Sequence, residues 1–345
     1  MINCGGRARI PFRRLPLRNP SHPQPPPESK NFHEPTPKQC AEVKGILAKA
    51  ANFPPELTDI IMDFAEYWAC SVASIDYSAT SSKQLSIHGG RYGEDQFLLR
   101  TEPLGLSTWH SDDEERWLKA APARKLGEEY PREEFERFAE EPPSTLDQPC
   151  RKVVFEIVSR DQGWSNDVDT RGTFKSSWTW FDAGIDRFDK SHTSMSCMAF
   201  TKHRSLTLLL GSDEETEKFE EKASDSAEKA PTTSSIRPIW PPLKENQSEY
   251  DHQLHPTADH KIQCNRVAEQ EWQHHRIEWS WIDNIDPESS AGKELEANGR
   301  GAATGDGTFL RSLKVGDMVT VWGRARFPGW TNSVQKIRVE VYWAS

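Results

Sequence analysis

Two stretches near the C-terminus alternate apolar and polar residues, over eleven positions from Asp317 to Phe327 and over nine from Gln335 to Trp343. A period of two predicts β-strands with one buried face. The Pro-Gly-Trp-Thr-Asn run that separates them is typical of a turn, so the pair is expected to form a C-terminal hairpin. Such a sheet needs a second apolar face to cover it, and the pattern therefore predicts an antiparallel β-sandwich.

The same reasoning places the other strands. Alternating or compact apolar runs predict one or two short strands between Leu85 and Arg100 and others at Arg151–Val158, Ser176–Asp182, Ser205–Leu210, Ile262–Val267 and Gln273–Ile282. In the hairpin, the buried face is expected to carry Val319, Val321, Ala325 and Phe327 on the first strand and Ile337, Val339, Val341 and Trp343 on the second.

Much of the chain is too polar to join this core. The chain of 345 residues has 24 prolines and only 35% hydrophobic residues. This composition favours one main domain with long segments that lie outside its core. The expected organisation is a disordered Pro/Arg-rich tail over 1–50, an amphipathic helix over 53–70 and a sandwich over 85–345, which contains a charged connector at 111–149 and a disordered insertion at 212–258. Deleting Asp213 to Gln247 is accordingly expected to leave the fold intact.

Charge and composition limit the cell compartments and the classes of partner that are expected. A net charge of -10 argues against binding to nucleic acid or to anionic membranes, and no apolar run approaches 18 residues. The six cysteines include no Cys-x-x-Cys pair, which favours reduced cysteines in a soluble cytoplasmic or nuclear protein. Five arginines without an acid in the first 27 residues leave a mitochondrial presequence as an alternative, although seven prolines there oppose its helix.

The predicted helix begins at a proline and carries an apolar stripe at helical spacing, made by Leu57, Ile60, Ile61 and Phe64 and continued by Tyr67 and Trp68. Its opening, Phe53-Pro54-Pro55-Glu56-Leu57, resembles the start of an F-box. That resemblance implies docking on a Skp1-like adaptor of a cullin ubiquitin ligase. The alternative is that the stripe packs on the chain's own sheet.

Several motifs of the C-terminal half resemble a family of ascomycete proteins with a tryptophan-rich β-sandwich: Asp161-Gln162-Gly163-Trp164, Ser177-Trp178-Thr179-Trp180-Phe181, and Ala325-Arg326-Phe327-Pro328-Gly329-Trp330. This resemblance implies no activity. The architecture is distantly similar to galactose-binding-like jelly rolls, including phloem lectins and the sugar-binding domains attached to some F-box proteins. This similarity implies a carbohydrate as one kind of ligand. The sugar-contact residues of those domains have no matching positions in this sequence.

Candidate ligand residues are the aromatic and polar side chains expected in loops at one end of the sandwich: Asp161, Trp164, Arg324, Trp330 and Asn332. Indole rings stack on sugar rings, and the polar groups match hydroxyls or a polar peptide tip. Alternatively, loop tryptophans cap the open end of the core.

No catalytic residue, cofactor or metal site is predicted. A Gly-x-Ser-x-Gly elbow is lacking, and the spacing of His252, His255, His260 and Cys264 matches no zinc motif. The sequence thus favours a non-enzymatic binding module for a protein or a carbohydrate. A ubiquitin-ligase substrate adaptor, or an enzyme with a site in the sandwich loops, remains the alternative.

Overall fold

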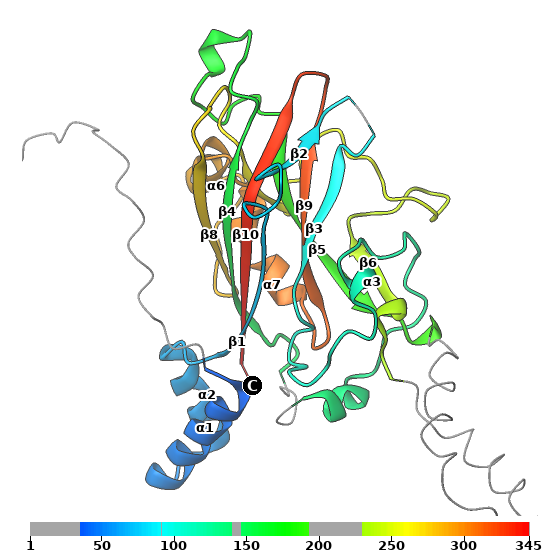
Figure 1. The fold of residues 1–345 in the computed structure, drawn as a ribbon. Helices are drawn as coiled ribbons and strands as arrows, with labels where there is room; N and C mark the ends of the chain where they lie inside the picture. The colour runs from blue at the N-terminus through cyan, green and yellow to red at the C-terminus, as the bar shows by residue number, and fades with distance from the viewer. Residues whose placement is uncertain (1–34, 91, 140–145, 193–229, 345) are drawn as a thin grey trace, which may run out of the picture. The chain divides into compact units, whose positions relative to one another are not determined.

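The computed structural model describes residues 35–90, 92–139, 146–192 and 230–344, which form two antiparallel five-stranded sheets (Figure 1). The first sheet has the order β1 (Ala69–Asp76), β10 (Thr331–Trp343), β4 (Cys150–Arg160) and β8 (Gln273–Ser280), and β2 (Leu85–His88) also pairs with β10. The second has the order β3 (Asp95–Arg100), β9 (Met318–Ala325), β5 (Thr179–Phe188) and β6 (Ile236–Trp240), and β7 (Lys261–Cys264) also pairs with β5.

The two sheets pack face to face, and the prediction of a mainly β chain with two packed antiparallel sheets is confirmed. One continuous apolar core lies between them, to which β4, β9 and β10 contribute alternate residues. Helices are few and short outside the N-terminus: α3 (Glu114–Trp117), α6 (Ser290–Ala297), α7 (Thr308–Ser312), and the 3₁₀ turns η1 (Arg132–Phe138), η2 (Val168–Thr170), η3 (Lys190–His192), η5 (Thr233–Ser235) and η6 (Ala302–Gly305).

The predicted C-terminal hairpin is wrong, although both of its strands exist. β9 belongs to the second sheet and β10 to the first, so the turn between them crosses from one layer to the other. Phe327, with a φ of 63°, and Gly329, with a φ of 95°, make that crossing. Alternation cannot distinguish the two arrangements, because the apolar faces of both strands meet in the same core either way. Phe327 itself lies in the crossing turn and is exposed.

The outer face of the second sheet is covered instead of facing solvent. Trp109, Tyr130 and Phe135 from the segment before β4 pack on Phe188 of β5 and form a second, smaller core. The region predicted to be a solvated charged connector, 111–149, therefore buries part of its aromatic residues. Charged residues of this segment such as Glu114, Glu115 and Glu133 stay exposed.

Two predictions for the N-terminal region need correction. Helix α1 (Pro37–Ala51) lies inside the range predicted to be a disordered tail, where Thr36 and Gln39 form a capping box and Cys40 is buried. Pro37 begins the helix instead of breaking it. Helix α2 (Pro55–Phe64) is shorter than the predicted 53–70, because Glu66 takes a φ of 49° and the chain turns into β1.

The predicted insertion 212–258 is also corrected where the structure describes it. β6 lies within it and pairs with β5 from Ile236 to Trp240. Deleting Asp213 to Gln247 would remove this strand from the sheet. A strand formed by few residues, with a proline at its centre, gives too weak a periodic pattern to be recognised in sequence. The predicted strand Ser205–Leu210 lies outside the described residues.

Candidate functional site

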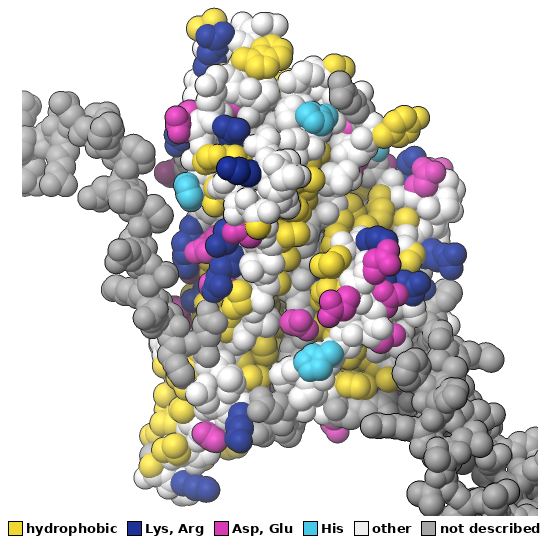
Figure 2. Space-filling view, viewed as in Figure 1, with side chains coloured by type: hydrophobic (Ala, Val, Ile, Leu, Met, Phe, Trp, Pro, Cys, Tyr) yellow, Lys and Arg dark blue, Asp and Glu magenta, His cyan; other side chains and the backbone are white. Residues whose placement is uncertain are grey.

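The apolar stripe of α2 faces away from the sandwich. The exposed fractions of its side chains are 44% for Leu57, 49% for Ile60 and 89% for Phe64, while Ile61 is half-buried. Only Thr58 and Met62 of this helix are buried. Figure 2 shows hydrophobic side chains gathered over α1 and α2, at the lower left of the view. The structure thus brings the four predicted docking residues together on one helix, three of them on its exposed face.

Ion pairs and one buried methionine, Met62, attach α2 to the rest of the protein. The carboxylate of Asp59 lies 2.7 Å from Lys44 of α1, and that of Asp63 lies 2.9 Å from Arg151 of β4. Trp68, which follows the helix, also donates its indole N–H to Asp63 at 2.8 Å. These contacts hold Asp59 and Asp63 against α1 and β4, while Thr58 and Met62 are the buried residues of the helix.

An outward apolar stripe forgoes stabilisation that burial would provide, roughly 1.5–3 kcal/mol for each large apolar side chain. Phe53, exposed just before the helix, and Ile46, exposed on α1, add to the apolar surface of this region. Contiguous apolar surface of this kind marks interaction sites in folded proteins. The candidate interaction surface is therefore the set Leu57, Ile60, Ile61 and Phe64, of which all but Ile61 are exposed, and it is called the α2 stripe below.

Three of the five predicted ligand residues are buried and serve the fold. Asp161 accepts hydrogen bonds from the backbone N–H groups of Gly163, Ala268 and Glu269, at 2.8, 2.6 and 3.0 Å. Burial raises its pKa, and these backbone bonds oppose the shift. Asp161 therefore fixes two neighbouring loops, and its carboxylate is not presented to a ligand.

Arg324 is 1% exposed and lies on the outer face of β9. Its guanidinium pairs with Asp182 of β5 at 3.2 Å and with Asp95 of β3 at 2.6 Å, and it lies 5.1 Å from the ring centre of Trp322. Arg324 thus links three adjacent strands.

Asn332 is wholly buried between the sheets. Its side-chain NH₂ donates to the carbonyls of Trp180 and Arg324, both at 3.2 Å, and its oxygen accepts from Asn265 at 2.9 Å. Asn265 in turn accepts from Ser159 at 2.7 Å. This network ties strands of both sheets together at one end of the core.

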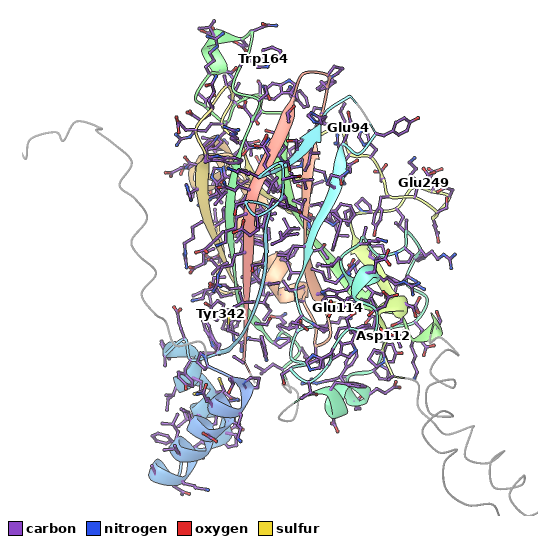
Figure 3. The ribbon with its side chains drawn as sticks, viewed as in Figure 1. Glu94, Asp112, Glu114, Trp164, Glu249 and Tyr342 are labelled. Carbon is purple, nitrogen blue, oxygen red and sulfur yellow. The ribbon has the colours of Figure 1, made fainter. Side chains whose placement is uncertain are left out.

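The remaining two, Trp164 and Trp330, lie at the loop end of the sandwich. Trp164 is 54% exposed and is the only exposed tryptophan of thirteen (Figure 3). Its loop is well braced, because Arg171 donates to the Ser165 carbonyl at 2.6 and 3.1 Å. Trp330 is half-buried in the crossing turn. The ring of Trp164 lies close to Gly329, which belongs to the same turn. A rigid loop that presents an indole is suited to stacking against a ligand.

Sequence reasoning missed a set of buried ion pairs in the second sheet. Arg100 and Asp186 meet at 2.8 Å with almost no exposure, and Arg187 meets Asp317 at 2.6 Å. Arginine and aspartate alternate with tryptophan along β5 and β9, which was the available pattern. The segments that cover this sheet are distant in sequence, so the local pattern does not show that the pairs are buried.

The histidines considered for a metal site are dispersed. His252 contacts Asp95 and Glu94 at 2.7 and 3.2 Å, whereas His260 stacks on Trp240 with ring centres 4.1 Å apart. Over the described ranges, no three His, Cys, Asp or Glu residues are placed to hold a metal ion. A groove of about 500 Å³ beside β6 is lined mainly by apolar residues and two lysines, with no histidine, cysteine or serine among its lining residues.

One buried histidine gives a testable pH dependence. Burial lowers the pKa of His275 on β8 from 6.5 to about 4, and the nearby Arg266 and Arg300 add to the effect. The unfolded chain binds this proton from about pH 6.5 downward, but the folded chain binds it only near pH 4. Stability should therefore fall as the pH drops through this window, by about 2 kcal/mol between pH 7 and pH 5 from this group.

Urea unfolding of the wild type and of His275→Gln at both pH values measures this contribution. The variant should lose about 2 kcal/mol less between pH 7 and pH 5 than the wild type. An equal loss in both proteins would show that His275 is not the responsible group.

Comparisons with known proteins leave the function to be argued from this geometry. No family model, curated protein or solved structure matches the chain. Among the residues that the structure describes, no helix is both long enough and apolar enough to cross a membrane.

Proposed function

We propose that this chain is a non-enzymatic binding module that docks a partner protein through the α2 stripe. The observation that carries the proposal is the orientation of α2, in which Thr58 and Met62 are buried and Leu57, Ile60 and Phe64 are exposed. An amphipathic helix that presents residues spaced i, i+3 and i+7 is a recurring mode of protein recognition.

The partner we propose is a Skp1-like adaptor of a cullin ubiquitin ligase. Support comes from the F-box-like opening Phe53-Pro54-Pro55-Glu56-Leu57, whose prolines lie outside or at the start of α2. In this proposal the protein acts in the cytoplasm or nucleus, and the sandwich holds what is to be delivered to the ligase.

The loop end of the sandwich is the proposed ligand side, in keeping with a galactose-binding-like jelly roll. Trp164 lies at the end of the sandwich away from α1 and α2 (Figure 3), so a ligand there would not compete with a protein on the α2 stripe. A carbohydrate ring stacked on Trp164 fits the exposure of this indole. Arg324, Asp161 and Asn332 are left out of this proposal because they are buried.

Titration of purified Skp1 into the full chain tests the docking proposal. The wild type should bind with a micromolar or tighter Kd, and Ile60→Glu should weaken binding at least 100-fold, since it places a charge in the centre of the stripe. Leu118→Asp is the matched control, because Leu118 is an exposed apolar residue that lies outside α1 and α2. Absence of binding by the wild type, or equal binding by Ile60→Glu, would refute the proposal.

A further inference from the structure

The free edge of β1 has unused backbone hydrogen-bonding groups. Tyr77, just beyond the strand, donates its N–H to Gln335 on β10, whereas Cys70 donates in the opposite direction, to Pro35. Successive residues of a strand point their N–H and C=O groups to alternate sides, and the pairing of β1 with β10 has no register shift. Val72 and Ser74 therefore point away from β10, and neither has a backbone partner on that side among the described residues.

The other sheet edges are protected. β8 carries the charged residues Arg276 and Glu278, and the Arg276 carbonyl accepts a hydrogen bond from the Arg300 side chain. β6 contains Pro238, and the side chain of Arg237 caps the Ile236 carbonyl. β3 has a register shift against β9, β7 is bonded to the segment around Gly299 and Gly301, and β2 has only four residues. These are the devices by which native proteins prevent strand addition.

β1 has such protection only at its ends, where Cys70 donates to Pro35 and the charged residue Asp76 closes the strand. From Ala69 to Ile75 its sequence is Ala-Cys-Ser-Val-Ala-Ser-Ile, without a charge, a proline or a bulge. Its inward residues Ala73 and Ile75 pack on the core, so the strand is held in place while its edge stays open. The regular stretch between these ends, which carries no charge, is a template for pairing.

We propose that the β1 edge is a second interaction site, at which an extended segment of a partner polypeptide adds to the first sheet as a further strand. Val72 and Ser74 would each use one N–H and one C=O to pair with the backbone of the incoming strand. The site is separate from the α2 stripe and does not depend on it.

A second copy of this chain is a poorer occupant. The open stretch from Val72 to Asp76 is about 17 Å long at the rise of a β-strand. Pairing of two such stretches would bury far less than the ~800 Å² on each partner that stable dimers need. A flexible segment anchored elsewhere on its own protein does not need this area.

Two-dimensional NMR on the full chain, with the probe peptide acetyl-Lys-Thr-Val-Thr-Val-Thr-Lys-amide, tests the inference. In the protein alone, the amides of Val72 and Ser74 should exchange with solvent at least 100-fold faster than those of Ala73 and Ile75. The peptide should shift β1 resonances saturably and slow the exchange of both exposed amides. Ser74→Pro should raise the peptide Kd at least tenfold without lowering the Tm, because this N–H makes no bond within the sheet and proline is tolerated at such edge positions.

Ser74→Lys is a second variant with the same expected loss of peptide binding. It tests the β1 edge if Ser74→Pro does not fold. The inference is overturned if millimolar peptide leaves β1 unchanged, if both variants bind the peptide as the wild type does, or if the two amides are already protected at all protein concentrations. Protection that grows with protein concentration would identify a second copy as the occupant and would also overturn it.

Discussion

Replacing Arg100 with leucine is expected to destabilise the protein by about 4 kcal/mol, because it leaves Asp186 buried without its partner. Arg100 donates to Asp186 at 2.8 and 2.9 Å and also to the carbonyls of Trp117 and Lys119, at 2.6 and 3.1 Å. The residue thus joins the second sheet to the segment that covers it. Chemical denaturation of the wild type and Arg100→Leu, monitored by tryptophan fluorescence, measures the loss.

Two controls separate the buried charge from the general effect of removing a cation. Lys119→Ala breaks an exposed ion pair with Glu115 and should cost less than about 0.5 kcal/mol. Arg100→Leu/Asp186→Leu should recover part of the lost stability, because both charges are then removed together. If the single Arg100→Leu variant is as stable as Lys119→Ala, the buried pair is not a structural link.

Asn332→Ala is expected to cost about 3 kcal/mol, since it leaves a cavity and removes the partner of a buried donor of Asn265. The same variant decides between the two roles considered for this residue. A ligand-binding asparagine at a loop could be removed with little change in stability, whereas a residue that tethers two sheets could not. Thermal and urea unfolding measure the difference.

Trp164→Ala is the matched control for Asn332→Ala, because it alters an exposed side chain at the same end of the sandwich. It should change the free energy of unfolding by less than about 1 kcal/mol. A change of similar size in both variants would contradict the assignment of Asn332 to the interior and Trp164 to the surface.

The sequence was most informative where periodicity is long. β4, β8, β9 and β10 were all predicted, because each alternates over eight or more residues with one face in the core. The assignment of β9 and β10 to different sheets could not be predicted, since a hairpin and a crossing turn bury the same residues. Strand partners are set by contacts between distant segments, such as β1 with β10, that local patterns do not report.

The candidate site was predicted in part. The stripe residues were identified from helical spacing, but this spacing fits a helix that faces inward as well as one that faces outward. The difference lies with Lys44 and Arg151, which come from other elements and pair with Asp59 and Asp63. The prediction of the ligand residues was less accurate, because the sequence near a turn does not show whether an Asp, Asn or Arg side chain is exposed or is buried with hydrogen-bond partners.

The most direct test of the account is the effect of polar substitutions in α2 on stability. Phe64→Asp should change the free energy of unfolding by no more than about 0.5 kcal/mol, because Phe64 is 89% exposed, and Leu57→Asp and Ile60→Asp should each cost about 1 kcal/mol, because these residues are 44% and 49% exposed. Met62→Asp, on the buried side of the same helix, should cost at least about 3 kcal/mol. If the three stripe variants are destabilised as strongly as Met62→Asp, the stripe packs on the chain's own core and the docking surface does not exist.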